Sequence, residues 1–533
     1  MSNKAKEWEP LSVPLNDDKV WDMVSRGLTG CCFQLDKPLG QTYSEIIKPE
    51  NIHQWSDLIA LIRPGALEVK VDGVNVPRIY ANRKNLGHAT TYEHDDLQPI
   101  LGKTQGLNIY QETSMMIAQE LAGFSGADSD KYIRKGIGKK LPEVIAKAKE
   151  MFIKGAAKNK ISKEQAETIF DSIEKSARYQ FNASHSYAYA LNGYYYSAYP
   201  KAHFPLEFFC TEMDFAHSVM QTTELEALTL VIREAQKMGI KVVLPDIRYF
   251  NTEFKILEGN ILFGLAKVKG VSKSCIQKVE KLYPNLAKMN WSELLLKVFD
   301  TLTSTQGESL IMSGAFDWTG LPRARMLHEN SVVNSKDTSM RLSDKERAYL
   351  TDNNLDVVDG LARLIADPSI VHDEKKVLYN QASLFNCKRK LFQLQNPHRR
   401  CVDSKRRLIK WEKLVLGSEF SYTKLDENPN SQLYSEYKCI DFLNRVIPEK
   451  IVSTISVIVS DIRTYDSFDG HGKMCYFQGY DETCVFPSFK VAPAKYDEYE
   501  HLIAEGQPVL VTGSLFKNQY GQQSFNVEKI DKL

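Results

Sequence analysis

A short basic segment, RKGIGKK at residues 134–140, carries the residue types best suited to bind a polyanion. Two glycines, Gly136 and Gly138, let the backbone approach a ligand closely, while arginine offers a fork of N–H groups and lysine a point charge. We therefore predict that it binds the phosphates of a nucleoside triphosphate or of DNA. The alternative is a solvated helix end, which is what most lysine-rich runs are. The cationic side chains concerned are Arg134, Lys135, Lys139 and Lys140.

A second segment, FNASHSYAYA at residues 181–190, places polar groups directly before aromatic ones. A polar patch of this kind could face a base pair and a triphosphate, with the aromatic rings as a stacking or packing surface. The alternative is a histidine with satisfied hydrogen bonds on a packed aromatic helix. The polar candidates are Asn182, His185 and Ser186, and Tyr187 and Tyr189 follow them.

The sequence gives little indication of a metal site. Asp128 and Asp130 form the only D-x-D pattern near the basic segment, and His471 stands alone in a glycine-containing stretch. The nine cysteines include no C-x-x-C pair with a matching partner pair, so a zinc site is not expected. We expect no metal site on this chain, and free thiols in a reducing compartment.

Helical periodicity surrounds both candidate segments. From Ile109 onward, apolar residues recur at three- and four-residue spacing for about 100 residues, and another helix over 223–238 ends at Gly239. A helix around WSDLIALI should end near Arg63, because the residue before a proline is biased away from helical geometry. Residues 66–103 lack clear periodicity and are predicted to be irregular.

The C-terminal half changes character twice. Residues 240–263 indicate short strands and turns, and 265–316 are helical, with a possible helix-hairpin-helix turn at 268–272 where Lys269 and Gly270 could contact DNA. The last 90 or so residues alternate as five strands with a helix between the third and fourth, which predicts an OB-fold barrel. Aromatic residues at its expected binding loops and strands are Tyr465, Phe468, Tyr476, Phe516 and Tyr520.

Bulk properties set the class of protein. With 533 residues the chain is too long for one core, and its net charge of +1 gives no global basic signal, so the local basic segments carry the case for nucleic acid. The polar N-terminus has no apolar signal region, and no apolar run approaches about 18 residues. We expect no membrane partner and a cytoplasmic location.

Taken together and in order, the motifs resemble the alpha subunit of bacterial DNA polymerase III, a C-family replicative polymerase. DLIALIRPGAL is similar to the family's D-x-I-A-L-x-R-P-G-P-L element, with Ala66 in place of proline. FNASHSYAYA is similar to FNKSHSAAYA, with Ala183 in place of lysine. The IYQE segment that leads into RKGIGKK also matches, although residues 135–137 replace an expected Arg-Ala-Met, and KAHFPLEFF, GLAKVKGV and LIMSGAFD complete the series.

The resemblance implies roles for the candidate residues. The fingers would present Arg134, Lys135, Lys139 and Lys140 to the triphosphate of the incoming dNTP. Asn182, His185 and Ser186 would lie near the nascent base pair, and Arg63 in the same domain. In the family, the catalytic carboxylates that hold Mg²⁺ lie in a palm domain N-terminal to the fingers. We expect no catalytic residue on this chain, and Mg²⁺ held by a separate palm-containing subunit.

A short motif adds a protein partner. Gln381-Ala382-Ser383-Leu384-Phe385 matches the family's Q-x-x-L-F peptide for the sliding clamp. Leu384 and Phe385 would fill an apolar pocket and Gln381 would set the register, as anchor residues do in short peptide interfaces. A chance match in a linker is the alternative.

The chain is accordingly predicted to be multidomain and mainly α, with a C-terminal all-β barrel. We expect polymerase fingers over 1–239, a helix-hairpin-helix-like DNA-binding region over 240–330, a linker and clamp-binding region over 331–440, and the OB fold over 441–533. The predicted function is the C-terminal part of a split replicative DNA polymerase that binds primer-template DNA and dNTP. The alternative is a non-catalytic, clamp-associated DNA-binding protein derived from a polymerase.

Overall fold

The computed structural model describes residues 9–137, 142–219, 224–335, 341–367, 381–396, 401–428, 431, 435–443, 446–447, 449–466, 472–519 and 521–533. The chain divides into two compact units. Unit 1 comprises Met1–Phe208 with Phe516–Ser524, and unit 2 comprises Phe209–Leu515 with Phe525–Leu533. No helix in the described ranges is both long enough and apolar enough to cross a membrane.

The first part of unit 1 is a cluster of short helices around tryptophan. The rings of Trp21 and Trp55 meet edge to face with centroids 6.1 Å apart, and Tyr194 lies 5.3 Å from Trp21. All three side chains are buried, so they form the centre of this core. The helices are α2 (Asp18–Ser25), α3 (Pro38–Ile47), α4 (Ile52–Leu61), α5 (Pro64–Glu68) and α6 (Val76–Leu86).

Helix α6 corrects the prediction that residues 66–103 are irregular. Its hydrophobic periodicity is weak, but its ends carry standard signals. Asn75 caps the helix by accepting from the Arg78 amide, Pro77 occupies the first turn, and Gly87 ends it with φ of 68°. The same stretch also holds a two-residue hairpin, β1 (Lys70–Val71) with β2 (Val74–Asn75).

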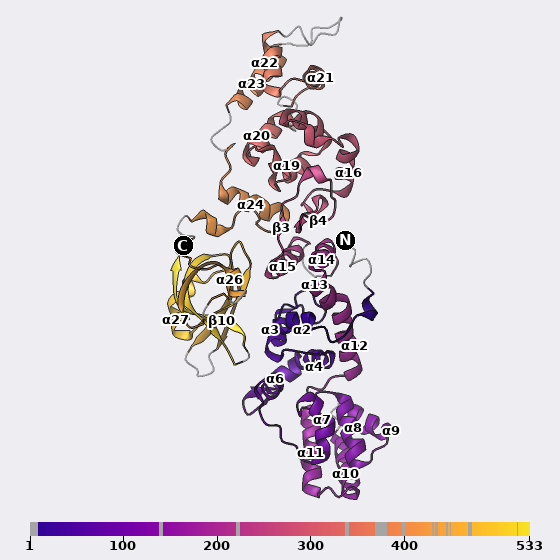
Figure 1. The fold of residues 1–533 in the computed structure, drawn as a ribbon. Helices are drawn as coiled ribbons and strands as arrows, with labels where there is room; N and C mark the ends of the chain where they lie inside the picture. The colour runs from indigo at the N-terminus through magenta and orange to yellow at the C-terminus, as the bar shows by residue number, and fades with distance from the viewer. Residues whose placement is uncertain are drawn as a thin grey trace. The chain divides into compact units, whose positions relative to one another are not determined.

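A second group of helices in unit 1 carries the basic segment. Its apolar core includes Phe152 and Phe170, whose ring centroids lie 5.7 Å apart. Glycine permits the close approach of α10 to α8, because a Cβ built on Gly155 would lie 1.8 Å from the carbonyl oxygen of Ala122. The elements are α7 (Gln98–Leu101), α8 (Gln111–Ala122), α9 (Gly126–Asp128), the π-helix η4 (Ser129–Ile137), α10 (Pro142–Lys158) and α11 (Lys163–Ser176). Figure 1 shows α8, α9, α10 and α11 gathered together.

Helix α12 (Ala183–Gly193) packs along α4 and carries the second candidate segment. It continues through the π-helix η5 (Tyr194–Ala198) into α13 (Tyr199–His203). The buried Lys201 of α13 donates to the carbonyl oxygens of Leu28 and Gly30 at 2.9 and 2.6 Å. These bonds give the buried ammonium acceptors, as a charge removed from water requires.

Unit 2 begins within α14 (Pro205–Val219), and α15 (Glu224–Lys237) follows. Three short strands form one sheet in the order β3 (Val242–Val243), β5 (Asn260–Leu262), β4 (Lys255–Leu257), with β3 parallel to β5. The helices after this sheet are α16 (Lys273–Leu282), α17 (Trp291–Glu293), α18 (Phe299–Thr301), α19 (Ser304–Met312) and α20 (Arg323–Val333).

The stretch predicted to be a linker contains further helices. The buried side chains of Lys390 and Glu346 form an ion pair of 2.8 Å between α23 and α21. Arg323 of α20 pairs with Glu412 of α24 at 2.8 Å and is also buried. The helices are α21 (Asp344–Asp352), α22 (Val357–Ala366), α23 (Gln381–Gln395) and α24 (Lys405–Leu416).

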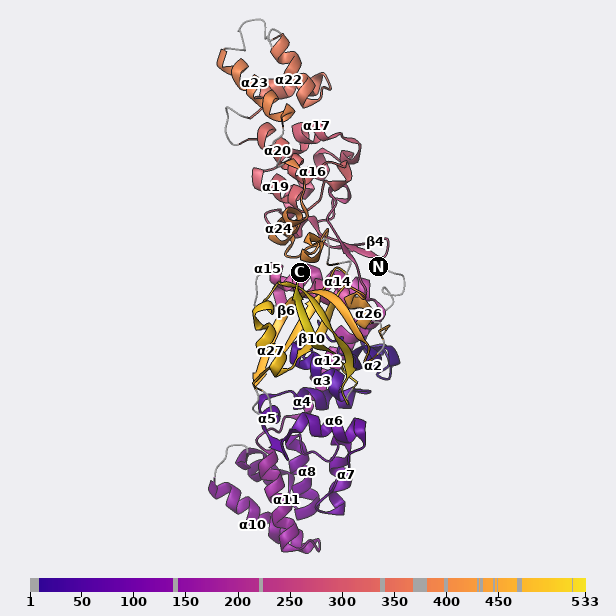
Figure 2. The ribbon, with the colours of Figure 1, turned by 90° about the vertical axis from the view of Figure 1, so that its left-hand side faces the viewer.

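The five predicted strands form a closed barrel, which confirms the predicted fold class (Figure 2). The order around the barrel is β10-β8-β7-β6-β9, and the long β6 pairs with both β7 and β9, with a register shift between Ser460 and Arg463. The helix α27 (Pro493–Tyr499) lies between the third and fourth strands. The strands are β6 (Val452–Asp466), β7 (Lys473–Tyr480), β8 (Val485–Val491), β9 (Pro508–Lys517) and β10 (Gln523–Lys532).

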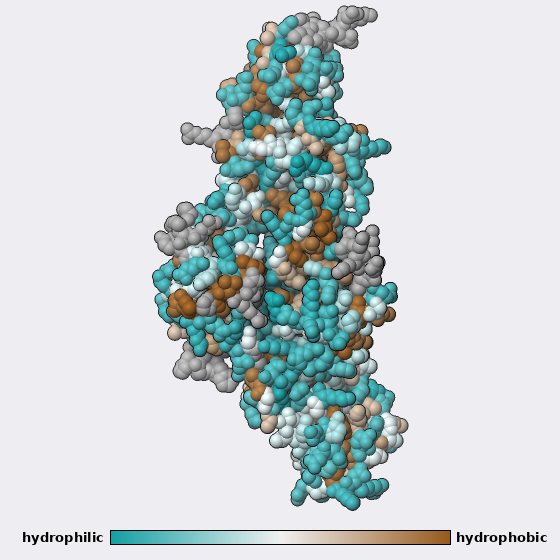
Figure 3. All heavy atoms as spheres, in the orientation of Figure 1, coloured by the Kyte–Doolittle hydropathy of each residue, from teal (hydrophilic) through white to brown (hydrophobic). Residues whose placement is uncertain are grey.

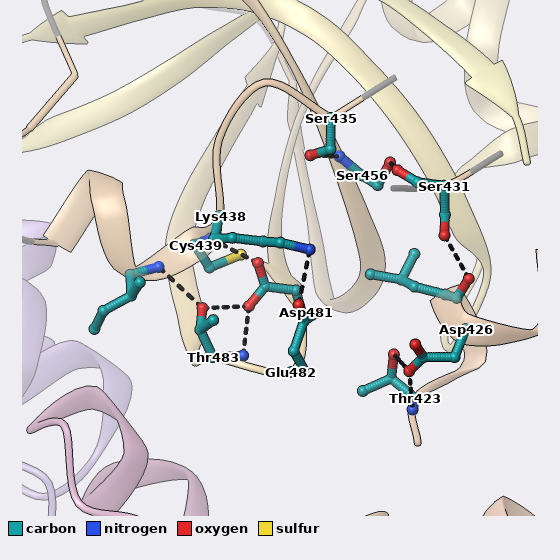
Figure 4. A network of polar contacts seen from close by, with 12 residues as sticks. Thr423, Asp426, Ser431, Ser435, Lys438, Cys439, Ser456, Asp481, Glu482 and Thr483 are labelled. Atoms are coloured by element: carbon teal, nitrogen blue, oxygen red, sulfur yellow. Dashed lines mark hydrogen bonds and ion pairs between the residues drawn. The ribbon is translucent and has the colours of Figure 1, made fainter. Parts of the chain in front are cut away.

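A polar network ties α26 (Cys439–Leu443) to the turn between β7 and β8 (Figure 4). The Asp481 carboxylate accepts from the backbone amides of Cys439 and Thr483 at 2.7 and 2.8 Å. The ammonium of Lys438 pairs with Glu482 at 2.7 Å. Every group of this network has a partner inside the fold, so we assign it a structural role.

The molecular face in Figure 3 is mostly hydrophilic, with apolar residues in scattered patches. Several large apolar side chains are nevertheless exposed, and they include Phe33, Phe385, Phe392, Tyr465 and Phe516. Three of them, Phe385, Tyr465 and Phe516, are predicted site residues.

The close contact at Gly155 gives a first prediction. We expect Gly155→Ala to lower the free energy of unfolding by about 1–3 kcal/mol, because the new methyl overlaps the Ala122 carbonyl. Alanine normally stabilises a helix interior relative to glycine. A loss of stability in Gly155→Ala would therefore report the steric overlap and not helix propensity. Urea unfolding followed by circular dichroism measures it. The control is Gly126→Ala, whose added Cβ would meet no described atom within 4 Å; equal effects of the two variants would contradict the prediction.

Candidate nucleotide and DNA interface

The N-terminus of α12 is held by a carboxylate from a distant helix. Asn182 caps α12, since its side chain accepts from the His185 amide at 2.7 Å. Glu112, in the first turn of α8, accepts from the Asn182 side-chain amide at 2.7 Å and from the Ala183 backbone amide at 2.9 Å. A negative group here also favours the positive end of the helix dipole. Sequence reasoning gave Glu112 no role, although it lies within the IYQE motif that carried part of the resemblance.

An aromatic column follows from this cap along α12. The guanidinium carbon of Arg63 lies 3.2 Å from the centroid of the Phe181 ring, and Phe181 meets His185 edge to face at 5.2 Å. His185 stacks on Tyr189 at 4.2 Å, and Tyr189 stacks on Phe33 at 5.2 Å. His185 and Phe33 are exposed, so the column offers π faces and a cation at the surface.

A buried carboxylate lies beneath this column. Asp57 of α4 is only 4% exposed and accepts from the hydroxyls of Tyr80 and Tyr110, each at 2.7 Å. The Tyr110 hydroxyl also lies 3.0 Å from that of Ser56. The Ser186 hydroxyl of α12 donates to the Ser56 carbonyl oxygen at 2.6 Å. These bonds link α4, α6, α12 and the segment before α8.

The backbone joins the same elements a second time. Residues Tyr110 and Phe181 form an isolated parallel bridge, in which the Phe181 amide donates to Ile109 and the Gln111 amide donates to Phe181, both at 2.9 Å. Phe181 directly precedes α12, and Tyr110 binds Asp57 of α4. The bridge and the carboxylate together therefore fix the start of α12 relative to α4.

Arg134 and Lys135 of the basic segment lie on η4, a separate element of unit 1. The Asp130 carboxylate pairs with both Arg134 and Lys135: the Arg134 Nε lies 2.6 Å from one oxygen and the Lys135 Nζ lies 2.6 Å from the other. These two pairings hold the pKa of Asp130 below its usual value, the Lys135 hydrogen bond being the larger cause. Asp128, the other half of the D-x-D pattern, instead accepts from the Ser125 hydroxyl at 2.7 Å.

Two further lysines flank an aromatic ring on η4. The ammonium groups of Lys131 and Lys147 lie 5.1 and 5.5 Å from the centroid of Tyr132. Hydrogen bonding to Lys147, with a smaller effect of Lys131, lowers the pKa of the Tyr132 hydroxyl. The predicted phosphate ligands Lys139 and Lys140 lie outside the described residues.

The predicted site residues therefore fall into two groups within unit 1. Arg63, Asn182 and His185 share the α12 cap and the aromatic column, whereas Arg134 and Lys135 lie on η4 with Asp130. Ser186 belongs to the first group but is fully buried, and its hydroxyl positions α12 rather than facing solvent.

The helix-hairpin-helix turn is present in unit 2. Lys269 and Gly270 are exposed, and Gly270 has a φ of 85°, a conformation that glycine adopts without strain. The Lys269 amide already donates to the Val415 carbonyl at 2.9 Å. Ser272, which stands where the family often has glycine, caps α16 by accepting from the Cys275 amide.

The motif predicted to bind the clamp lies at the start of α23. Phe385 is 66% exposed and Leu384 is partly buried, while the Gln381 side chain lies outside what the structure describes. Seven residues, or about two turns, further along the same helix, Phe392 is also 66% exposed.

On the barrel, Tyr465 of β6 and Tyr476 of β7 form an edge-to-face pair with centroids 6.1 Å apart. Tyr465 is 55% exposed and Phe516, at the end of β9, is 41% exposed. Phe468, His471 and Tyr520 fall among the residues left undescribed. Across the described ranges, no three or more His, Cys, Asp or Glu side chains gather in a way that could hold a metal ion.

Comparison with known protein families gives one match in the N-terminal part of the chain and one in the middle. Residues 1–160 match the family described as the bacterial DNA polymerase III alpha subunit finger domain, and residues 239–326 match a helix-hairpin-helix motif. The chain thus combines a fingers-domain match, a helix-hairpin-helix match and a closed barrel consistent with an OB fold. The chain is homologous to the bacterial DNA polymerase III alpha subunit, which confirms the resemblance.

Three relatives illustrate the extent of the homology. The DNA polymerase III subunit alpha of Escherichia coli (strain K12) is 34% identical over 338 residues, 61% of this chain and 28% of that protein. The subunit of Aquifex aeolicus (strain VF5) is 28% identical over 510 residues, 95% of this chain and 38% of that protein. The Thermus aquaticus subunit is 32% identical over 61% of this chain and 26% of its own length. The chain thus spans between about a quarter and two fifths of these relatives.

Asp57 gives a prediction about pH. Burial raises the pKa of this carboxyl from 3.8 to about 6, and the hydrogen bonds from Tyr80 and Tyr110 oppose the rise. Because the folded pKa is the higher one, the unfolded chain loses its proton first, so this group lowers stability progressively from about pH 4 to about pH 6. The full effect, present above pH 6, is on the order of 3 kcal/mol.

The variant Asp57→Asn cannot ionise and should lose this pH dependence. We compare the free energy of unfolding of Asp57→Asn with that of wild type, by urea unfolding at each pH. The difference, variant minus wild type, should be larger at pH 7 than at pH 4.5. Asp72→Asn is the control, since Asp72 is an exposed aspartate of the same unit. A gap between Asp57→Asn and wild type that stays constant with pH would contradict the assignment.

Proposed function

We propose that this chain supplies the nucleotide- and DNA-binding part of a replicative DNA polymerase, working with a palm domain carried by a separate polypeptide. The observation that carries the proposal is the column of Arg63, Phe181, His185 and Tyr189 at the start of α12, which is exposed at His185 and partly buried at the other three, in a chain homologous to polymerase III alpha subunits. The reaction of the complete enzyme would be DNA-directed nucleotidyl transfer.

The chemistry divides between the two partners. In the proposal, Arg134 and Lys135, with Lys139 and Lys140, bind the triphosphate of the incoming dNTP and offset charge on it. Helix α12 places His185 beside the nascent base pair, where a rigid π surface favours a stacked geometry. The palm would hold Mg²⁺, which positions the attacking oxygen and stabilises the phosphoryl group.

Other predicted contacts, on the helix-hairpin-helix turn and on the barrel, would bind the rest of the DNA. Lys269 and Gly270 present a charge and a tight turn that suit the phosphate backbone of a duplex. Tyr465, Tyr476 and Phe516 offer exposed or partly exposed rings on the barrel, which suit stacking with single-stranded bases. Such contacts raise the local concentration of the fingers at a primer end.

The test is primer extension with Mg²⁺ and dNTPs. The purified chain should extend a primer only when a palm-containing polypeptide from the same source is added. In that mixture we expect His185→Ala and Arg134→Ala each to lower kcat/KM by about 10- to 100-fold, the range for losing one charge-assisted or stacking contact. Lys158→Ala is the matched control, because it removes one exposed positive charge at the far end of α10.

Two outcomes would count against the proposal. Efficient synthesis by this chain alone would rule out a separate palm. Full activity of both His185→Ala and Arg134→Ala in the mixture would favour the alternative, a DNA-binding protein without a polymerase role, whose DNA affinity would fall with salt but would not change with dNTP.

We further propose that the start of α23 binds the sliding clamp through Leu384 and Phe385. Phe385→Ala should weaken clamp binding at least tenfold in surface plasmon resonance, because a short peptide interface depends on few anchors. Phe392→Ala is a closely matched control, since Phe392 lies on the same helix with the same 66% exposure. Equal loss in both variants would point to general apolar contact, and no loss in either would exclude the motif.

A further inference from the structure

The two described cations of the basic segment are already neutralised in part by one carboxylate. Asp130 contacts Lys135 through one oxygen and Arg134 through the other, both at 2.6 Å. The side chains of all three residues remain between about one third and one half exposed, so the cluster faces solvent. An incoming anion would therefore meet cations that already have an anionic partner.

The local backbone explains how one carboxylate reaches both cations. Residues Ser129–Ile137 form a π-helix, in which a turn takes more residues than in an α-helix, so positions i+4 and i+5 both return to the face of residue i. Asp130 is position i, and Arg134 and Lys135 are positions i+4 and i+5.

The surrounding charges leave Asp130 as the internal anion of this cluster. Asp128, two residues away, is bound to the Ser125 hydroxyl and contributes the N-terminal turn of α9. Lys131 of η4 and Lys147 of α10 lie over the Tyr132 ring and add positive charge near it. The cluster thus keeps a net positive charge that can attract a polyphosphate, while its best-placed donors are occupied.

We propose that Asp130 is an internal counter-anion for the triphosphate-binding cations, which an incoming polyphosphate must displace. The proposal rests on the proposed function of Arg134 and Lys135. Asp130 acts through these two residues, so it is a positioning residue that sets nucleotide affinity. It keeps the cations ordered and paired without nucleotide, and it reduces the strength with which they hold any phosphate.

The test measures equilibrium binding of a fluorescent dNTP, and separately of inorganic tripolyphosphate, to the full chain. Asp130→Asn should bind both probes about two- to fivefold more tightly than wild type at low salt, the range for releasing exposed ion pairs. The gain should shrink as salt rises, because exposed charges are screened. Asp128→Asn is the control, since it removes the same charge two residues away without touching Arg134 or Lys135.

A second comparison shows whether Asp130 acts through its partners. In an Arg134→Gln, Lys135→Gln background, Asp130→Asn should give little or no gain. Unchanged or weaker binding by Asp130→Asn, while Arg134→Gln weakens binding, would overturn this inference and leave the proposed function intact. If Arg134→Gln and Lys135→Gln left nucleotide binding unchanged, both the inference about Asp130 and the proposed function would be overturned. The same would hold if neither wild type nor Asp130→Asn bound the probes. Circular dichroism of each variant confirms folding, which substitution at this exposed position should preserve.

Discussion

The buried carboxylate of Asp57 is the constraint on which the candidate interface depends. A carboxylate removed from water is costly unless donors surround it, and here two tyrosine hydroxyls from different elements supply them. Meeting this requirement brings α4, α6 and the start of α8 together, and Ser56 and Ser186 extend the bonds to α12. The surface that carries His185 is therefore placed by polar bonds beneath it as much as by apolar packing.

Charge is handled differently at the surface and in the interior. Lys201 and Arg323 are buried and have acceptors inside the fold, so they hold segments together. Arg134 and Lys135 are exposed and share one carboxylate, an arrangement of little energetic worth in water that a polyphosphate can replace. The proposed anion site is therefore a local one, on a chain whose net charge is only +1.

The homology to polymerase III alpha subunits gives these features a common context. It extends over 95% of this chain with the Aquifex aeolicus protein but over only 38% of that protein's length. The elements that we propose to bind nucleotide and DNA are the cap and aromatic column, the basic π-helix, the helix-hairpin-helix turn and the closed barrel. Chemistry at a primer end would require these elements to meet metal-bound carboxylates, which is why the proposed function includes a palm.

The sequence by itself determined the features that depend on local pattern. Alternation over the last 90 or so residues predicted five strands and a closed barrel, and RKGIGKK and FNASHS marked the candidate segments through residue type alone. Tertiary structure alone decided how these segments are held. Glu112 caps a helix 70 positions later, Asp57 meets Tyr80 and Tyr110, and Ser186 turns inward. Partners so far apart leave no spacing signal in the chain, because only packing of the helices brings them within hydrogen-bonding distance.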